Sequence, residues 1–267
     1  MTLLVASDLD RTLIYSAAAL DLTGPDHRAP RLLCVEVYDR KPLSYMTETA
    51  AATLEALSRT AAFVPTTTRT REQYGRIHLP GPVPEYAICA NGGELLVRGE
   101  SDPGWRRDVE RRLAAACAPL DEVRAHLVRT ADPAWLLKER TAEDLFAYLV
   151  VDRPLLPDTW VKELTEWADA RGWSVSLQGR KLYAVPRPLT KSAAVAEVAR
   201  RTGAAEVLSA GDSLLDADLL LAADRGWRPG HGELAAAGWT APHVTALETR
   251  GVAAGEEILA AFAAAAA

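Results

Sequence analysis

The chain has 267 residues, of which 49% are hydrophobic and 25% are charged, and its formal net charge is -6. This composition is that of an ordinary folded protein and shows no sign of a disordered, collagen-like or repetitive chain. The acidic balance gives no support to nucleic-acid binding. No apolar stretch reaches the length of a membrane span, and the N-terminal MTLLVASDLD is too short and too soon acidic for a signal peptide.

The cysteine content indicates a reducing compartment. Cys34, Cys89 and Cys117 are odd in number and have no local pairing pattern, which argues against a disulfide framework. None has the C-x-x-C spacing of a metal site, so we interpret all three as small buried hydrophobic residues. We therefore expect a cytoplasmic protein without a nucleic-acid or membrane partner. The sequence leaves open whether it is a monomer or a homodimer.

The first predicted elements are a strand, a helix and a second strand. Leu3 to Ala6 is a short apolar run, typical of a strand buried on both faces of a parallel sheet, and it ends abruptly in Ser7-Asp8-Leu9-Asp10. Thr49 to Arg59 has the spacing of an amphipathic helix. Ala61 to Val64 is a second apolar run, which breaks into the polar segment PTTTR. Polar residues at the carboxyl ends of such strands lie where open α/β sheets bind ligands.

The middle of the chain, from Gly92 to Pro188, has a different pattern, because its strands come in pairs. Prolines near both ends of this segment are expected to stiffen the two crossings. We predict an inserted α+β cap domain over residues 91–188. Its expected helices are Trp105–Cys117 and Pro157–Ala170, its expected single strands are Glu94–Val97 and Leu145–Val151, and its expected hairpin joins Trp173–Leu177 to Lys181–Val185.

The last part of the chain returns to alternating elements. Ser192 to Arg201 predicts a helix that Gly203 closes. Glu206 to Ala210 predicts a strand that leads into Gly211-Asp212-Ser213. Strand and helix alternation at both ends of the chain predicts a doubly wound, Rossmann-like parallel sheet, built from residues 1–90 and 189–267.

Asp8 and Asp10 are separated by one residue and follow directly on a predicted strand. Two clustered carboxylates repel each other unless a cation or a shared proton intervenes. Mg²⁺ prefers oxygen ligands and is typically held by one or two carboxylates together with substrate phosphate. An aspartate can also attack phosphorus, while a second one protonates the leaving group and later activates water. Taken alone, the pair is equally compatible with a solvated turn.

Four segments, in order along the chain, resemble the motifs of the haloacid dehalogenase (HAD) superfamily of phosphatases. They are DLDRT, FVPTTTR, PLTKSAAV and GDSLLDADLL, and they resemble DxDxT, an apolar strand ending in Thr or Ser, a lysine at a helix start, and GDxxxD. DxDxT alone is a weak signal, whereas four motifs in order form a specific one that covers both ends of the chain. The corresponding residues are Asp8, Asp10, Thr67, Lys191, Asp212 and Asp216.

The resemblance implies a catalytic role for several of these residues. Asp8 would be the nucleophile, and Asp10 would be the general acid and base. Lys191 would neutralise negative charge on the phosphoryl group and on Asp8. Thr67 would hydrogen-bond the phosphoryl oxygens, and the adjacent Thr68 and Arg69 are further candidates for substrate binding. The alternative for the threonine run is the cap of a following helix.

The resemblance also implies a Mg²⁺ site. Asp8 and Asp212 would bind the ion directly, and the backbone carbonyl of Asp10 would also touch it. Asp216 would be a ligand or a partner behind the ligands, and the alternative is that it caps the next helix.

The inserted segment lies where the Cof-type and sucrose-phosphate-phosphatase-like branch of the superfamily carries a large α+β cap. ICANGG, which contains Asn91, resembles the turn that opens this cap; a turn is the favoured role for Asn91, and substrate contact is the less favoured one. In the cap, Arg180 and Lys181 at the predicted hairpin tip are candidates for reading an anionic or polar substrate group, against the alternative of a solvated face. One departure from the family pattern is Arg11, which stands where many members have glycine.

These observations favour a Mg²⁺-dependent phosphohydrolase that acts on a small phosphorylated metabolite, such as a sugar phosphate, through an aspartyl-phosphate. A phosphomutase on the same fold is the alternative among enzymes. A catalytically silent HAD-like protein that serves as a binding partner is the alternative from another class. The cap, which is expected to choose the substrate, is the part of the sequence with the fewest motifs.

Overall fold

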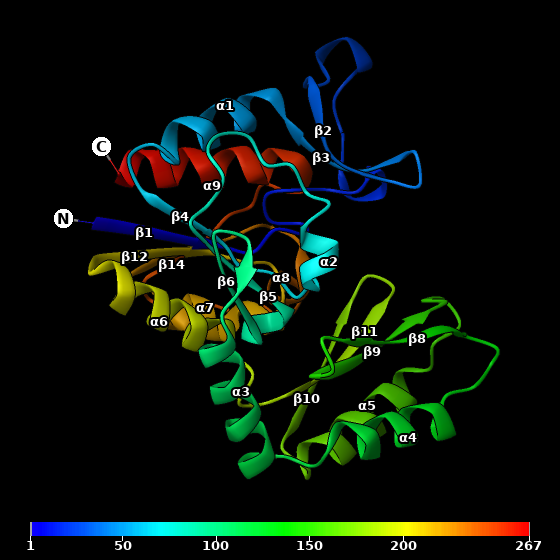
Figure 1. Cartoon of the computed structure of the whole chain (residues 1–267). Coiled ribbons are helices and arrows are strands. Elements are labelled where there is room, and N and C mark those ends of the chain that lie inside the picture. The colour runs from blue at the N-terminus through cyan, green and yellow to red at the C-terminus, as the bar shows by residue number, and fades with distance from the viewer. Residues whose placement is uncertain (1, 267) are drawn as a thin grey trace. The chain divides into compact units, whose positions relative to one another are not determined.

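A computed structural model describes residues 2–266. The chain divides into two compact units. The first contains the residues up to Ser101 and those from Lys191 onward, and the second is Asp102–Thr190. Each unit has its own sheet, as Figure 1 shows.

A parallel sheet of five strands forms the centre of the first unit, in the order β14-β13-β12-β1-β4. The order confirms a doubly wound sheet, because the chain proceeds from β1 to β4 on one side and from β12 outward on the other. The buried, apolar character of β1 and β4 explains why short continuous hydrophobic runs predicted them. The bounds are β1 Thr2–Ser7, β4 Ala62–Pro65, β12 Ala204–Ala210, β13 Arg225–Arg228 and β14 Val244–Ala246.

Helices cover both faces of this sheet (Figure 1). On one face α1 (Glu48–Leu57) packs against α9 (Gly251–Ala265), and Leu54 and Phe262 are buried in one hydrophobic core with Phe63 of β4. On the other face lie α6 (Lys191–Thr202) and α7 (Ala217–Ala222), which pack against each other and against β12. Two shorter helices, α2 (Arg71–Tyr74) and α8 (Gly232–Ala236), follow β4 and β13.

A β-hairpin of β2 (Leu32–Tyr38) and β3 (Lys41–Thr47) precedes α1, and the sequence did not predict it. The register of the hairpin shifts on both sides of Glu36, so the regular alternation that signals a strand is broken there. Glu36 is buried although it lies on a two-stranded hairpin. A buried acid on such an element points to a specific partner, which is described with the site below.

The first unit extends further than the predicted boundary at residue 90. β5 (Tyr86–Cys89), β6 (Glu94–Val97) and β7 (Glu100–Ser101) form an antiparallel sheet. This sheet joins the main one, because Ile88 bridges Thr66 in parallel and accepts a hydrogen bond from the Thr67 amide at 2.8 Å. The chain therefore passes between the two compact units at residues 101/102 and 190/191. The boundaries predicted from the pattern of prolines and glycines are 90/91 and 188/189.

The second unit is an antiparallel sheet in the order β10-β11-β9-β8, with helices on one of its faces (Figure 1). The expected hairpin is confirmed and is the β10–β11 pair. The expected helices near residues 105 and 157 and the expected strand near residue 146 are also confirmed. One helix and one strand, α4 and β8, were not predicted. The bounds are α3 Pro103–Ala116, α4 Leu120–Thr130, β8 Leu136–Ala142, β9 Phe146–Val151, α5 Asp158–Asp169, β10 Trp173–Gln178 and β11 Lys181–Pro186.

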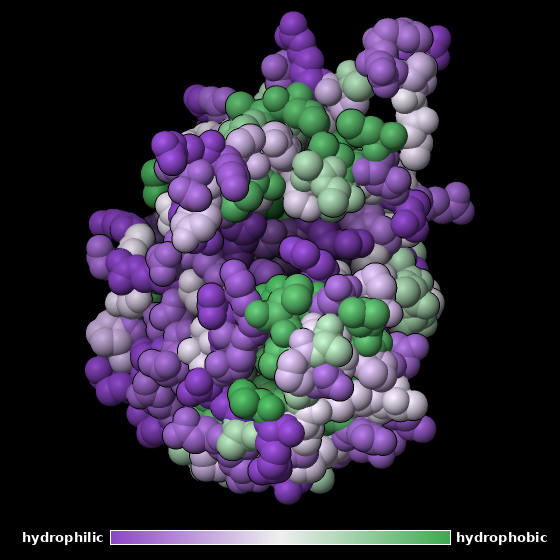
Figure 2. Space-filling view, turned by 90° about the vertical axis from the view of Figure 1, so that its right-hand side faces the viewer, coloured by the Kyte–Doolittle hydropathy of each residue, from purple (hydrophilic) through white to green (hydrophobic). Residues whose placement is uncertain are grey.

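On the face drawn in Figure 2, hydrophobic residues are interspersed with hydrophilic ones. Among residues 2–266, no helix has both the length and the apolar character that crossing a bilayer requires.

Candidate active site

Three neighbouring strands of the main sheet deliver polar residues to one edge. Asp8 follows β1, Thr67 follows β4 and Asp212 follows β12. The ladders continue past the strand ends, because the Asp8 amide donates to the Ala210 carbonyl at 2.9 Å and the Thr66 amide donates to Ser7 at 2.8 Å. The strand order reverses around β1, and open α/β sheets bind ligands at the carboxyl ends of strands beside such a reversal.

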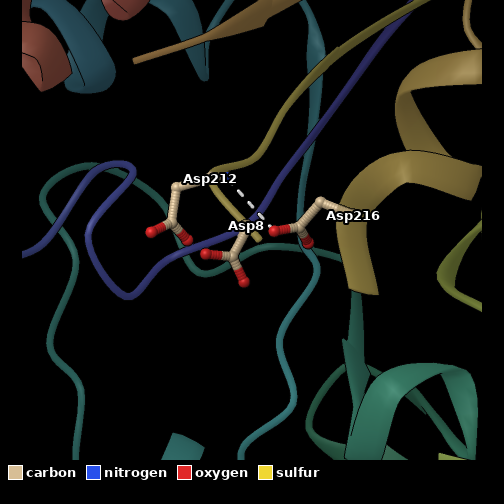
Figure 3. Close-up of side chains that lie close together, drawn as sticks. All are labelled: Asp8, Asp212 and Asp216. Carbon is tan, nitrogen blue, oxygen red and sulfur yellow. Dashed lines mark hydrogen bonds between the residues drawn. The ribbon is translucent and has the colours of Figure 1, made fainter. Parts of the chain in front are cut away.

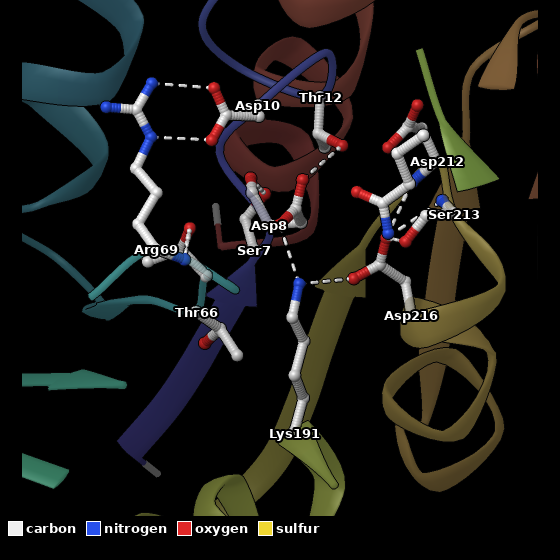
Figure 4. A network of polar contacts seen from close by, with 12 residues as sticks. Ser7, Asp8, Asp10, Thr12, Thr66, Arg69, Lys191, Asp212, Ser213 and Asp216 are labelled. Atoms are coloured by element: carbon white, nitrogen blue, oxygen red, sulfur yellow. Dashed lines mark hydrogen bonds and ion pairs between the residues drawn. The ribbon is translucent and has the colours of Figure 1, made fainter. Parts of the chain in front are cut away.

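Lys191, the first residue of α6, reaches this edge with a fully buried side chain. Its Nζ atom lies 2.6 Å from Oδ1 of Asp8 and 2.5 Å from Oδ1 of Asp216 (Figure 4). Burial alone would lower the pKa of this ammonium group, but the two carboxylates raise it above its ordinary value. Lys191 is therefore a fixed positive charge in contact with Asp8, and a buried charge of this kind persists only when it is paired.

Asp8 is almost completely buried, and both of its oxygens have donors. Oδ1 accepts from Lys191, and Oδ2 accepts from the Thr12 hydroxyl at 3.2 Å. Burial raises the pKa of Asp8 to about 7; Lys191 opposes the rise, while Asp216 and Asp10 add to it. The two donors, Lys191 and Thr12, fix the direction of the Asp8 carboxylate.

Asp8, Asp212 and Asp216 each place a carboxylate oxygen within 4.8 Å of the other two (Figure 3). Burial raises the pKa of Asp212 well above its ordinary value, and repulsion from Asp8 and Asp216 adds to the rise. The three carboxylates face two contacting cations, Lys191 and Arg11, so one negative charge is left over when all are ionised. A set of buried oxygen donors with excess negative charge fits a hard divalent cation such as Mg²⁺.

Asp216 differs from the other two acids because donors surround its carboxylate. Oδ2 accepts from the Asp212 amide at 3.1 Å, the Ser213 amide at 2.9 Å and the Ser213 hydroxyl at 2.7 Å, while Oδ1 contacts Lys191. Gly211 permits this close approach, since a Cβ atom there would lie 2.3 Å from Cβ of Asp216. Asp216 stands at the N-cap position of α7 but makes no side-chain capping bond to that helix; its carboxylate instead completes a capping box with Ser213 in the turn Leu214–Asp216, beside the carboxylate cluster.

Asp10 points to a different partner. Arg69 binds its carboxylate through two hydrogen bonds, Nε to Oδ2 at 2.6 Å and an Nη atom to Oδ1 at 2.7 Å (Figure 4). The same guanidinium pairs with Glu36 at 2.9 Å, and the Ser44 hydroxyl donates to Glu36 at 2.6 Å. Burial would lower the pKa of Arg69, but Asp10 and Glu36 raise it. Arg69, expected at the substrate, is here occupied in holding Asp10.

The threonine run divides its tasks. Thr67 is fully buried, and its hydroxyl accepts from the Arg69 amide at 3.1 Å. Thr70 caps α2, with Gln73 completing a capping box, so the helix-cap alternative falls on this residue. Thr68 is buried beside them.

The remaining expected residues lie in the turn before β6 and in the second unit. Asn91 is buried with a left-handed backbone, φ 55°, and its amide donates to the Thr67 carbonyl at 3.0 Å, so it joins the turn to the second motif. Arg180 is exposed in the β10–β11 turn. Lys181 begins β11, and its Nζ atom lies 5.7 Å from the centre of the Tyr148 ring. Both residues belong to the β10–β11 hairpin of the second unit, and their contact with substrate stays a prediction.

Sequence reasoning missed several residues that shape the site. Glu36 and Ser44 had no signal, because they come from the unpredicted hairpin. Ser213 lies inside the fourth motif as a neighbour of Asp212, and a polar residue there could have been anticipated as a partner of Asp216. Thr12 is the threonine of DxDxT, so the motif itself contained the signal for its bond to Asp8.

No protein-family model matches the sequence, and no curated protein matches it either. Solved structures do resemble it. A sucrose-phosphatase from Synechocystis, in complex with sucrose and phosphate, is 18% identical with a TM-score of 0.63, over 98% of each chain. A HAD subclass IIB sugar phosphatase is 15% identical with a TM-score of 0.59 over the full length of both chains. The C-terminal domain of trehalose-6-phosphate phosphatase from C. albicans is 14% identical with a TM-score of 0.57, over 98% of this chain and 92% of that one. Along nearly its whole length, the chain therefore has the fold of the HAD-superfamily phosphatases.

Proposed function

We propose that the protein is a Mg²⁺-dependent phosphohydrolase that acts on a small phosphorylated metabolite through an aspartyl-phosphate intermediate. One observation carries the proposal: a buried lysine contacts a buried aspartate at the carboxyl edge of the sheet, 2.6 Å apart, inside a cluster of carboxylates. Phosphoryl transfer depends mainly on positioning and charge stabilisation, and these groups supply both. Among the described residues, Cys34, Cys89 and Cys117 form no disulfide, which supports the proposed reducing, cytoplasmic location.

Asp8 and Asp212 are the proposed direct ligands of Mg²⁺, together with the backbone carbonyl of Asp10. When bound, the ion would offset the negative charge that approaches from the substrate. We propose that Asp216 acts behind these ligands, since its carboxylate already accepts from the Asp212–Ser213 loop and contacts Lys191; a direct ligand role is the alternative.

In the first step, an oxygen of Asp8 attacks phosphorus, and the bond from phosphorus to the leaving oxygen breaks. Lys191 and Thr12, which hold the Asp8 carboxylate, fix the direction of the attack. Asp10 in its acid form gives a proton to the leaving oxygen, so that an alcohol departs. Lys191 and the Thr67 hydroxyl stabilise the negative phosphoryl oxygens.

In the second step, Asp10, now a carboxylate, takes a proton from water. The water oxygen attacks phosphorus, the bond to Asp8 breaks, and phosphate leaves. The double hydrogen bond from Arg69 suits this step, since a guanidinium stabilises and orients a carboxylate. Asp8 is then restored beside Lys191.

A sugar phosphate is the proposed substrate class. The support is the likeness to a sucrose-phosphatase and to a subclass IIB sugar phosphatase, together with a separate α+β cap. In the cap, Arg180 and Lys181 are the proposed contacts to polar or anionic groups of the substrate, and Asn91 and Thr68 remain candidates nearer the phosphate. We propose that the inserted segment, predicted as residues 91–188 and compact over Asp102–Thr190, is the specificity domain.

Phosphate release from a panel of phosphorylated metabolites, with Mg²⁺ and with EDTA, tests the proposal. We expect release from at least one sugar phosphate, dependent on Mg²⁺. Conversion of a sugar phosphate into an isomer without phosphate release would favour the phosphomutase instead. The absence of turnover across the panel, combined with the absence of Mg²⁺ binding, would favour a silent binding partner.

A further inference from the structure

Arg11 adopts a backbone conformation that arginine rarely takes. Its φ angle is 64°, in the left-handed region that favours glycine. Two hydrogen bonds to the backbone of Arg11 hold this conformation. The Arg11 amide donates to the Ile14 carbonyl at 2.8 Å, and the Arg11 carbonyl lies 2.7 Å from Nε2 of the His231 side chain. A side chain retained at a position that costs backbone energy suggests a task for that side chain.

The guanidinium of Arg11 turns toward the carboxylate cluster. Its Nε atom lies 3.1 Å from Oδ2 of Asp212, whose side chain is buried, while the arginine side chain keeps 39% of its surface exposed. The guanidinium of Arg11 thus offsets negative charge in the cluster, and the partly exposed side chain can move away from Asp212 into solvent.

Asp212 is one of the proposed ligands of Mg²⁺. The ion and the Arg11 guanidinium would therefore compete for the same carboxylate. Lys191 contacts Asp8 and Asp216 rather than Asp212, so it does not compete for this particular carboxylate. Asp216 is occupied by the Ser213 loop, as described above. Arg11 is therefore the positively charged group that a divalent ion must displace from Asp212.

We propose that Arg11 is a tethered competitor for the metal site: it neutralises Asp212 when no ion is bound and weakens divalent-cation binding by having to be displaced. The inference rests on the proposed function for the identity of the site, but it concerns the affinity of that site rather than the reaction. Loss of the charged side chain should tighten Mg²⁺ binding roughly three- to tenfold, the range expected for one partly exposed ion pair together with one like charge.

Isothermal titration of the metal-free protein with MgCl₂ measures this affinity without any substrate. Arg11→Met removes the charge and keeps the length of the side chain. Arg11→Gly removes the charge and also suits a φ of 64°, so it stays folded even where methionine strains the loop. Arg11→Lys keeps a positive charge. The control is Arg59→Met in the turn after α1, where the partner of Arg59 is Glu55 rather than any residue of the cluster.

We expect a lower Kd for Mg²⁺ in both Arg11→Met and Arg11→Gly, and a Kd closer to the wild-type value in Arg11→Lys and Arg59→Met. An unchanged or higher Kd in both uncharged variants, with normal binding to the wild type, would overturn the inference and leave the proposed function standing. An absence of Mg²⁺ binding to the wild type would overturn both. Binding that survives Asp212→Asn would show that the ion lies elsewhere and would likewise overturn both.

Discussion

The direction of the Asp10 side chain depends on a guanidinium that is itself held by a second acid. Arg69 reaches Asp10 with two nitrogens and Glu36 with a third. Lysine at this position would keep the charge but could not form the forked pair. The proposed acid and base would then lose its fixed direction.

We predict that Arg69→Lys lowers kcat roughly 10- to 100-fold, within the contribution that a positioned general acid and base makes. Glu36→Gln keeps the shape of the side chain and should lower kcat in the same direction but by less, because it acts through Arg69. KM should change little in both variants if neither residue binds the substrate. A rise in KM with an unchanged kcat would instead assign Arg69 to substrate binding, as the motif alone suggested.

At the same scale, the limits of sequence reasoning are clear from Glu36. The motifs predicted Asp8, Asp10, Lys191 and Asp212, since the spacing of each follows from the strand or helix that carries it. Glu36 meets Arg69 from 33 positions away in the chain, on a hairpin with two shifts in register. A contact of this kind depends on tertiary structure, and no local pattern indicates it.

Among the elements, the loop from Gly211 to Asp216 is closed by a contact that only glycine allows. A methyl group at Gly211 would collide with Cβ and Cγ of Asp216, both part of the structure behind the proposed metal ligands. We predict that Gly211→Ala destabilises the protein by about 1–3 kcal/mol, as overpacking does in buried sites, and lowers activity. Gly24→Ala is the matched control, because a Cβ there meets nothing within 4 Å. Equal stability of both variants in urea denaturation would contradict the close approach.

His231 links the Arg11 turn to the start of α9. Nδ1 accepts from the Gly251 amide at 3.1 Å, so Nε2 carries the proton that it donates to the Arg11 carbonyl at 2.7 Å. Burial lowers the pKa of His231 below 6.5, while the hydrogen bond to Arg11 opposes the shift. The unfolded chain therefore binds this proton at a higher pH than the folded one does, and the contribution of His231 to stability is lost as pH falls below about 6.5.

We predict that the difference in free energy of unfolding between the wild type and His231→Gln shrinks as pH falls from 8 to 5. Urea denaturation in EDTA across this range measures it, and subtraction removes the titration of groups that both proteins share. A difference that stays constant with pH would mean that His231 does not titrate with folding in this window.

The elements themselves were more predictable than their ends. Buried strands such as β1 and β12 and the β10–β11 hairpin follow from apolar runs and turn residues. The β2–β3 hairpin escaped prediction because its bulges break the alternation, and α4 begins without a side-chain cap that would have marked its start.

For the whole molecule, the alternation of elements and the order of the motifs predicted the parallel core with an α+β insert. The limits of the insert depend on whether the β5–β7 sheet packs with the core or with the cap. The Thr66–Ile88 bridge joins this sheet to the core, and the prolines nearby do not indicate that contact. The sequence does not predict the identity of the substrate, because cap residues such as Arg180 belong to no motif that specifies what they bind.

A bound ion stabilises the whole fold if it prefers the folded chain. At a Mg²⁺ concentration ten times its Kd, the added stability is about 1.4 kcal/mol, which corresponds to a rise in Tm of roughly 2–4 °C. We predict this rise for the wild type over EDTA in differential scanning calorimetry, and its loss in Asp212→Asn. The same rise in Asp212→Asn would place the ion away from the carboxylate cluster.

Replacement of Asp8, the proposed nucleophile, is the strongest test of the proposed reaction. Asp8→Asn preserves the shape of the side chain and removes the attacking carboxylate, whereas Asp39→Asn changes an exposed hairpin-turn residue with a φ of 48° that asparagine tolerates. We predict that p-nitrophenyl phosphate hydrolysis with Mg²⁺ persists in the wild type and in Asp39→Asn and falls at least roughly 1,000-fold in Asp8→Asn. Hydrolysis by Asp8→Asn at the wild-type rate would contradict the account.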